Sequence, residues 1–164
     1  MVFDVFKQWV ALVENQTSFK LKCLRTDNNG GEFISHVCSN LCVEKGIRRK
    51  LSAPYTPSQN GVTERMNRTI QENMHSMLSM AGLSDAFWAE AIATSVHLIN
   101  HSPSVPLGFK VPEEVWTSLP PSYGHLRVFG CKAYVHVPKV KHSKLDPKSK
   151  RHILLGYGSS GEMG

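Results

Sequence analysis

The spacing of apolar residues predicts helices over much of the first 117 positions. In several segments apolar side chains recur every three or four residues, which is the period of an amphipathic helix. The predicted helices cover residues 3–14, 32–45, 62–81 and 85–100, with a shorter one at 112–117. Gly46 and Gly82 are natural stops for two of them, and Ser84 is a natural N-cap for the helix at 85–100.

The apolar stripes of these helices are expected to form core rather than a cofactor pocket. In the first helix the predicted stripe is Phe3, Phe6, Val10 and Val13. In the second it is Phe33, Val37 and Leu41, with Cys38 as a further candidate for the inward side. In the third it is Met66, Ile70, Met74, Met77 and Leu78. In the fourth it is Phe87, Trp88, Ala91, Ile92, Val96 and Ile99.

Alternating apolar and polar residues predict strands at 19–25, 47–52, 125–137 and 153–157. In the first strand Phe19, Leu21 and Cys23 are expected on the buried side. The intervening segments are a polar loop at 53–61, a proline-punctuated connector at 101–122 and a basic loop at 138–152. Helices and strands alternate before the connector and β structure follows it. The pattern therefore predicts an α/β domain at 1–122 and a β domain at 123–164.

Positive charge is concentrated in one C-terminal segment. The net charge is +6, yet residues 1–124 carry equal numbers of basic and acidic side chains. Residues 125–152 carry eight Lys or Arg and one acid, a net charge of +7. Such asymmetry favours a polyanionic partner, nucleic acid first, although a solvated basic tail is an alternative interpretation.

Composition excludes several other classes of protein. With 41% hydrophobic and 20% charged residues, the chain has ordinary globular composition. No apolar run approaches the roughly 20 residues that span a bilayer, and no signal peptide opens the chain. Four cysteines without a Cys-x-x-Cys pair favour a reducing compartment, nuclear or cytoplasmic rather than secreted. Cys38 and Cys42 lie near His36, but zinc would need two further ligands, so buried thiols are the other interpretation.

Two carboxylates stand where a metal site is often built. Asp27 follows a predicted strand, and Glu64 lies in the first turn of a predicted helix. Carboxylates in such places can share divalent cations such as Mg²⁺, which prefers oxygen ligands. The alternative is structural, because Asp27 can open an Asx turn and Glu64 is a favourable acid at a helix start.

Polar residues follow Glu64 along one helix face, at the i+3, i+4 and i+7 positions. Arg68 and Gln71 are placed to contact a nucleic-acid strand, and the preceding loop offers backbone donors and a lid. A solvated helix face is the alternative. The candidate nucleic-acid-binding residues are Asn60, Arg65, Asn67, Arg68 and Gln71.

The motifs of the chain resemble the integrase of copia-type retrotransposons of plants. The resemblance rests on the stretches at 25–33, 46–49, 53–70, 87–91 and 98–100. Later motifs resemble the SH3-like β domain that follows the core in these polyproteins. They are Leu126-Arg127-Val128-Phe129-Gly130-Cys131, Lys144-Leu145-Asp146-Pro147-Lys148-Ser149 and Leu155-Gly156-Tyr157.

The resemblance implies a ribonuclease-H-like α/β fold and an Asp, Asp, Glu triad that holds Mg²⁺ or Mn²⁺. Asp27 corresponds to the second Asp and Glu64 to the Glu of that triad. The implied activity is 3′-processing of element DNA and strand transfer into target DNA, by direct displacement without a covalent protein intermediate. Implied partners are both DNAs and, for the intact protein, further copies of itself.

Two departures from the family pattern shape the expectation. The first Asp and the first three strands of the family's core lie upstream of the helix at 3–14, and Asp4 is on that helix. Two residues, Asn28 and Asn29, replace the usual single Asn, so 36 residues separate Asp27 from Glu64, one more than usual. We therefore expect a truncated core followed by a partial SH3-like segment, inactive as an isolated chain. Whether it is an enzyme is left open, since a non-catalytic nucleic-acid-binding module derived from a transposon fits as well.

Overall fold

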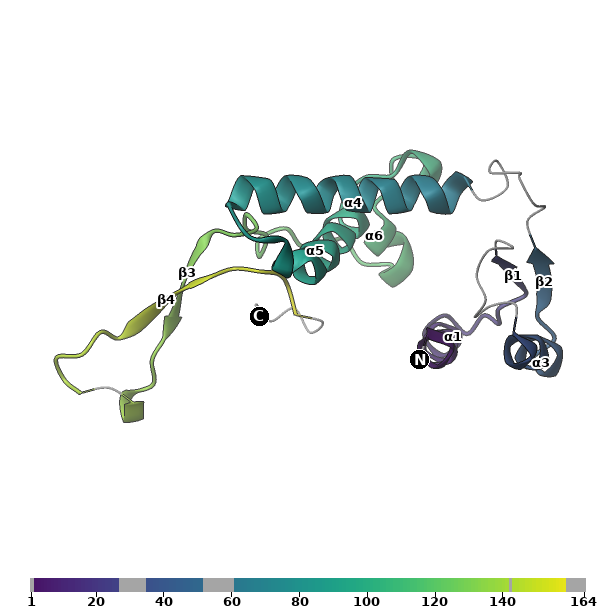
Figure 1. Ribbon diagram of the computed structural model, residues 1–164, viewed down its shortest axis with the longest axis horizontal. Coiled ribbons are helices and arrows are strands. Elements are labelled where there is room, and N and C mark those ends of the chain that lie inside the picture. Colours follow the sequence, from purple (N-terminus) through teal and green to yellow (C-terminus); the bar gives the residue numbers. More distant parts are fainter. Residues whose placement is uncertain (1, 27–34, 52–60, 142, 159–164) are drawn as a thin grey trace. The chain divides into compact units, whose positions relative to one another are not determined.

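The computed structural model describes residues 2–26, 35–51, 61–141 and 143–158 (Figure 1). The chain forms two compact units, Met1–Arg65 and Met66–Gly164. The division lies inside helix α4 (Gly61–Ala81), one turn after its start. Both helices and strands are present in the described residues, so the α/β class expected from the pattern is confirmed.

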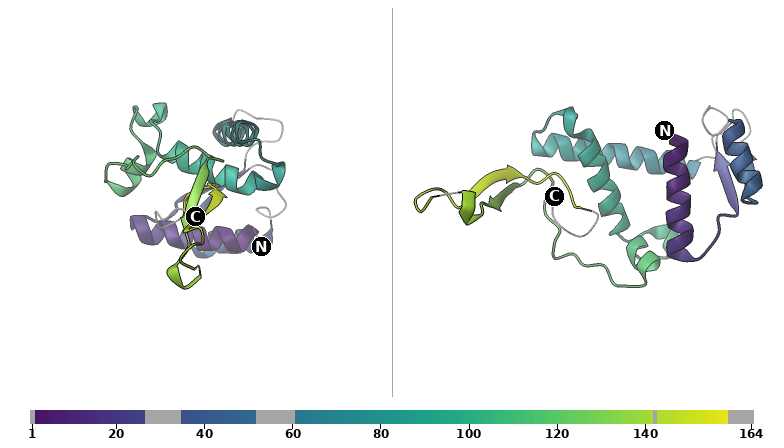
Figure 2. Two further views of the ribbon diagram at one scale, coloured as in Figure 1. Left: turned by 90° about the vertical axis from the view of Figure 1, so that its left-hand side faces the viewer. Right: turned by 90° about the horizontal axis from the view of Figure 1, so that it is seen from below.

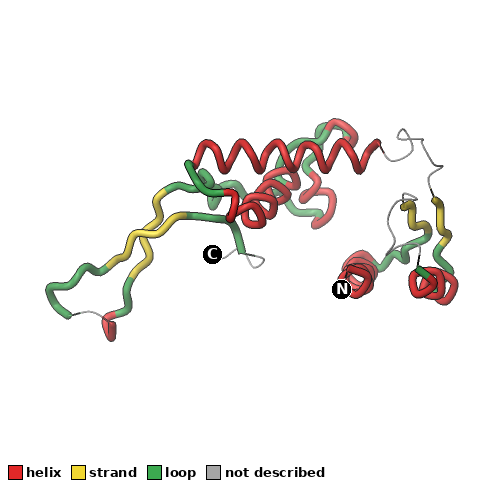
Figure 3. The backbone as a smooth tube through the Cα atoms, in the orientation of Figure 1, coloured by secondary structure: helices red, strands yellow, loops and turns green. Residues whose placement is uncertain are grey.

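The first unit is built on two parallel strands. Helix α1 (Val2–Thr17) precedes β1 (Cys23–Thr26), and α3 (His36–Glu44) lies between β1 and β2 (Arg48–Leu51) in the sequence. The strands pair in register from Cys23 opposite Arg48 to Thr26 opposite Leu51. Parallel strands need a crossover connection, and α3 supplies it. Figure 3 shows the pair as a two-stranded sheet within the described part of the chain.

Cysteines form the centre of the first unit's core. Cys38 and Cys42 of α3 are 0% and 2% exposed and cluster with Ile47. Phe3 of α1 and Leu24 of β1 pack against this cluster. Burial raises the pKa of the Cys42 thiol, and the neighbouring Cys38 adds to the rise. Both thiols therefore act as small apolar groups, as one of the two interpretations of the sequence held.

Glu14 ties the end of α1 to its neighbours. Its Oε1 accepts a hydrogen bond from the backbone N–H of Leu21 at 3.0 Å. Its Oε2 lies 3.2 Å from Lys45 Nζ, just after α3. The hydrogen bond from Leu21 lowers the pKa of Glu14, and Lys45 lowers it further. One carboxylate thus links α1, the approach to β1 and the end of α3.

Two details of the first unit differ from the sequence prediction. The stripe predicted for α1 is right, with Val10 2% exposed. In α3, however, Val37 is 57% exposed and the adjacent Cys38 is buried. The helix turns the Cys38–Cys42 stripe inward because that stripe meets Ile47. In the first strand Phe19 is 78% exposed, since β1 begins only at Cys23 and the alternation before it is not a strand. Cys23, also predicted on the buried side, is exposed, and Leu24 packs against the core instead.

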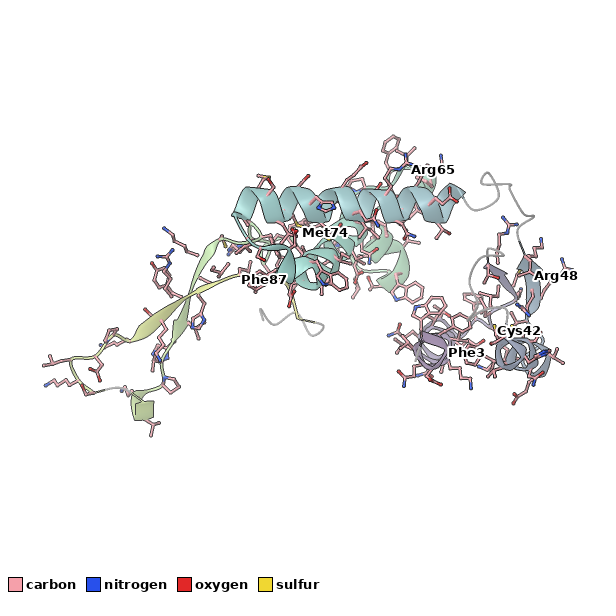
Figure 4. All side chains as sticks on the ribbon, viewed as in Figure 1. Phe3, Cys42, Arg48, Arg65, Met74 and Phe87 are labelled. Atoms are coloured by element: carbon pink, nitrogen blue, oxygen red, sulfur yellow. The ribbon has the colours of Figure 1, made fainter. Side chains whose placement is uncertain are left out.

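The second unit is centred on two helices. After α4 come the 3₁₀ turn η2 (Asp85–Phe87) and α5 (Trp88–Asn100). Ser84 caps η2, where its hydroxyl oxygen accepts a hydrogen bond from Ala86 N. Turn η3 (Val105–Leu107) and helix α6 (Pro112–Thr117) follow. Leu78, Ala91 and Phe129 form the buried cluster, and Met74 packs against it from α4 (Figure 4). The core therefore joins α4, α5 and the segment after α6.

A two-stranded antiparallel ribbon ends the described chain (Figure 2). It consists of β3 (Lys132–His136), turn η4 (Lys139–Lys141) and β4 (Ser149–Ile153). The predicted strand at 125–137 is thus only its second half, and the strand predicted at 153–157 lies earlier, at 149–153. The apolar run after Ile153 misled the prediction, because Leu154 is buried and Leu155 packs on the α4–α5 core instead.

Glycine 130 marks the place where this segment meets α4. Its φ is +78°, and a Cβ placed on it would lie 2.4 Å from Ala81 Cβ. Its N–H donates to the carbonyl of Leu154 at 2.8 Å, next to the ribbon. A close backbone approach and a left-handed conformation both require glycine here.

The buried side of α5 is also more polar than predicted. Trp88 is 56% and Val96 38% exposed, whereas Thr94 and Ser95 are buried. Thr94 Oγ1 donates to the carbonyl of Leu155 at 3.3 Å. Small side chains let the C-terminal segment come close to α5. The predicted domain division after residue 122 stays a prediction.

None of the helices in the described residues has the length and apolar character needed to cross a membrane.

Candidate functional site

Glu64 occupies the first turn of α4 with its side chain exposed. A helix begins with backbone N–H groups that lack partners within the helix, and a carboxylate is favourable there. The neighbouring Arg65 turns back toward the start of α4, where its Nε donates to the carbonyl of Gly61 at 3.0 Å. In the described part of the chain no hydrogen bond or ion pair engages the Glu64 carboxylate. Its oxygens are thus accessible to a ligand.

Asp27 and Asn60 lie outside the described residues. Strand β1 ends at Thr26, so Asp27 directly follows its carboxyl end in the sequence, as the pattern predicted. Its partner β2 ends at Leu51 on the same edge of the parallel pair. Carboxyl ends of parallel strands are a common place for ligand-binding side chains. The convergence of Asp27 with Glu64 stays a prediction.

One face of α4 is polar and exposed. Asn67, Arg68 and Gln71 follow Glu64 on the continuous helix, and all have exposed side chains. None of the hydrogen bonds or ion pairs found in the described residues occupies Arg68 or Gln71. Met74 and Leu78 turn into the core, so the helix has one packed and one free side (Figure 4). The free side fits a polar ligand.

The ribbon carries a net charge of +6, which equals the net charge of the whole chain. We call residues 132–153 the basic hairpin; it holds seven Lys or Arg and one acid, Asp146. Asp146 stabilises the turn, because its Oδ2 accepts a hydrogen bond from Ser143 N at 2.7 Å. This hydrogen bond lowers the pKa of Asp146. Lys150 and Arg151 are exposed on β4, opposite Val135 and Tyr134. Cations beside an exposed aromatic ring suit a nucleic-acid strand.

Comparison with known proteins places the chain among retrotransposon proteins. It is 55% identical over 157 residues to the retrovirus-related Pol polyprotein from transposon TNT 1-94 of Nicotiana tabacum, covering 96% of this chain and 12% of that protein. An uncharacterized mitochondrial protein of Arabidopsis thaliana is 48% identical over 86 residues, covering 52% of this chain and 69% of that protein. The chain belongs to the copia-type retrovirus-related Pol polyproteins.

Two further matches concern the C-terminal part of the chain and its fold. The family described as "Retroviral polymerase SH3-like domain" matches residues 131–162, which include the basic hairpin. A chain of the simian T-cell lymphotropic virus intasome, solved in complex with PP2A regulatory subunit B56 gamma, has a similar fold. Its TM-score is 0.50 at 20% identity, over 87% of this chain and 51% of that one. The segment spans about a tenth of the length of the TNT 1-94 polyprotein.

Three histidines of the chain form a cluster that was not predicted from the sequence. His97 and His101 lie one turn apart at the end of α5, and His125 comes from the connection after α6. Their ring nitrogens all lie within 4.8 Å of one another. Burial lowers the pKa of His97, as do His101 and His125, while Glu113 raises it. The i, i+4 spacing of His97 and His101 was the available signal, but nothing local points to His125.

Proposed function

We propose that this segment takes part in DNA integration, as a piece of an integrase core in which Asp27 and Glu64 are two of the metal-holding carboxylates. The observation that carries the proposal is Glu64, exposed in the first turn of a helix whose polar face continues through Gln71. Family membership with transposon Pol polyproteins supports it, as does the fold shared with an intasome chain. We assign the fold to the ribonuclease-H-like class, with residues 1–122 as core and 123–164 as SH3-like segment.

The donor set fits Mg²⁺ or Mn²⁺. Both residues offer hard oxygen ligands, and the Glu64 carboxylate is exposed at the helix start. When bound, the ions stabilise the charge on the attacking and leaving oxygens of a phosphodiester. Two carboxylates hold such ions weakly, so residues 1–164 alone are not expected to catalyse strand transfer. The family resemblance implies a third carboxylate, the first Asp of the triad.

The exposed face of α4 positions the DNA strand. Arg68 supplies a guanidinium that pairs with phosphate oxygens, and Gln71 adds a neutral donor one turn further on. Arg65, held at the carbonyl of Gly61, keeps a positive charge beside the loop that contains Asn60. Asn67 lies between Arg65 and Arg68 on the helix. These contacts fix the register of the strand without reading its sequence. The partners are element ends and target DNA, and the intact protein acts as a homo-oligomer.

The reaction exchanges one phosphodiester for another. Water first cleaves the element end and leaves a 3′-hydroxyl. That hydroxyl then displaces a target 3′-oxygen at phosphorus, so one P–O bond forms as one breaks and no protein atom bonds to phosphorus. The inserted Asn beside Asp27 bears on this step, because a displacement of about 1 Å at a reacting group can cost roughly 10²-fold in rate.

A second candidate function rests on the basic hairpin. The hairpin has seven Lys or Arg, and its single acid, Asp146, accepts a hydrogen bond from Ser143 N. This composition suits a transposon-derived module that binds nucleic acid without catalysis. Binding of this kind is driven by counterion release and weakens steeply with salt. It needs neither Asp27 nor Glu64.

Two assays on the 164-residue chain test these proposals. Strand transfer with Mg²⁺ or Mn²⁺ on element-end DNA is expected to give no product, and robust product contradicts the need for a further carboxylate. Fluorescence anisotropy with labelled DNA tests binding. Replacing Lys150 and Arg151 by Gln should lower the salt slope by about 2, whereas replacing the exposed Lys20 and Lys22 should not. Equal slopes for both double variants contradict binding by the hairpin.

A further inference from the structure

We propose that His97, His101 and His125 form a binding site for a transition-metal ion of the Zn²⁺ class. The site is separate from the Asp27 and Glu64 carboxylates and does not rest on the proposed function. In the described residues this is the one group of three or more His, Cys, Asp or Glu side chains whose ligand atoms converge. Nitrogen ligands select zinc, copper, nickel or cobalt over Mg²⁺.

The distance between two of the nitrogens fits a tetrahedral ion. His97 Nε2 and His125 Nε2 lie 3.4 Å apart. Zinc–nitrogen bonds of 2.0–2.1 Å in tetrahedral geometry place ligand nitrogens about 3.3–3.4 Å apart. The third ligand atom lies within 4.8 Å of both. The pair is therefore already at binding distance.

His101 is oriented as a metal ligand. Its Nδ1 lies 2.9 Å from the carbonyl oxygen of His97, to which it donates. A proton on Nδ1 leaves the Nε2 lone pair free, and metal-binding histidines usually make this type of second hydrogen bond. The i, i+4 position on α5 brings the rings of His97 and His101 to 4.1 Å between centroids. The two rings thus stack side by side at the C-terminal end of α5.

Tyr157 holds the third histidine in place. Its ring stacks on His97 at 4.6 Å and meets His125 edge-on at 5.6 Å. Its hydroxyl donates to the carbonyl of Arg127 at 2.7 Å and accepts from the N–H of Arg127 at 2.9 Å. The loop that carries His125 is therefore fixed two residues from that histidine. Such support is what a preformed site requires.

The surroundings suit a neutral imidazole set with one open position. All three rings are half-buried. Glu113, half-buried on α6, adds negative charge near His97. Three histidines leave the fourth position to water. A bound ion would join the end of α5 to the chain that leads into the basic hairpin.

Cobalt titration of the full chain, prepared without a histidine tag and stripped with chelator, tests the site. We expect one equivalent of Co²⁺ to give the visible absorption of a tetrahedral ion, and Zn²⁺ to abolish it. His101→Gln should weaken binding more than about 100-fold, since loss of a ligand exceeds the 10–100-fold loss for its supporting groups. The control His75→Gln, exposed on α4, should bind as the parent does. Absent absorption, or equal loss in both variants, overturns the proposal.

A second variant replaces one metal-binding side chain by another, so that the site can still be tested if His101→Gln does not fold. His125→Cys, made in a Cys23→Ser background to remove an exposed thiol, keeps three ligands. We expect it to retain Co²⁺ and to add a thiolate charge-transfer band in the near ultraviolet. Circular dichroism checks that it is folded. A folded His125→Cys chain that binds Co²⁺ without this band would place the ion elsewhere and overturn the proposal.

Discussion

The cores of the two units differ in how far apart in the sequence the residues that form them lie. In the first unit the buried cluster of Cys38, Cys42 and Ile47 comes from one helix and the turn after it. In the second, Leu78 and Ala91 meet Phe129 from beyond α6. The buried cluster of the first unit thus lies between residues 38 and 47, with Phe3 and Leu24 packed against it, whereas the cluster of the second unit depends on docking of the C-terminal segment. The docked segment also completes the histidine cluster and leads into the basic hairpin. Substitutions that disturb this docking should therefore lower the free energy of unfolding more than substitutions in the cysteine cluster of the first unit.

The largest effect is expected at Gly130, the point of docking. Gly130→Ala places a Cβ 2.4 Å from Ala81 Cβ and strains a φ of +78°. Overpacking and left-handed strain together should lower the free energy of unfolding of the second unit by about 3 kcal/mol or more. Chemical denaturation followed by circular dichroism measures it.

Two other glycines separate the causes at Gly130. Gly82 has a φ of +63° but open space around it, so Gly82→Ala reports strain alone, about 1–2 kcal/mol. Gly124 has neither feature, and Gly124→Ala should lie within about 0.5 kcal/mol of the parent. If Gly130→Ala lowers the free energy of unfolding no more than Gly82→Ala does, the result would contradict the close approach of Gly130 to Ala81.

Metal removal is expected to affect the second unit next. If zinc is present at 100 times its dissociation constant, chelation should lower the free energy of unfolding by about 2.7 kcal/mol. Hydrogen exchange resolves the two units. Amides of α5 should lose protection, while those of α1 and α3 should not change. Equal loss in both units would contradict a site made by His97, His101 and His125.

A smaller loss is expected in the local core. Cys42→Ser places a hydroxyl where the side chain is 2% exposed, which should cost about 1–3 kcal/mol. The exposed Cys23 provides the control, because Cys23→Ser should be neutral within about 0.5 kcal/mol. Thermal melts of both variants check this. Equal melting temperatures would show that the cysteine cluster is not the core of the first unit.

The smallest effect is a pH dependence at Glu14. Its folded-state pKa is lowered by the Leu21 N–H and then by Lys45, so the unfolded state binds the proton more readily. The stabilisation is present above the ordinary pKa of the carboxyl and is lost as pH falls through the lowered value. Glu14→Gln should melt below the parent at neutral pH, and the gap should close in acid. A gap independent of pH would contradict this role.

The sequence predicted elements better than their inward faces. The helix at α4 was predicted to within one residue, because its period extends over five turns. In α3 the prediction was wrong for Val37, which is exposed, whereas the further candidate Cys38 is buried. Val37 and Cys38 begin adjacent apolar stripes, and only packing on Ile47 chooses between them. Likewise, nothing local shows that Leu155 leaves the strand to reach α4.

Candidate site residues divide in the same way. Glu64 and the residues after it were found from their spacing and from family motifs in one continuous stretch. The histidine cluster was missed because His125 reaches His97 only through the fold, 28 positions along the chain. Small residues such as Thr94 and Ser95 carried no sign of the close approach that buries them.

The most direct test of the central claim is binding of Mn²⁺ to the Asp27 and Glu64 carboxylates, measured by electron paramagnetic resonance. His101→Gln in all samples removes the competing site. We expect weak binding, with a dissociation constant on the order of millimolar. Asp27→Asn and Glu64→Gln should each abolish it, and Glu72→Gln, exposed on the same helix, should leave it unchanged. Binding that survives Glu64→Gln as well as it survives Glu72→Gln would contradict the assignment.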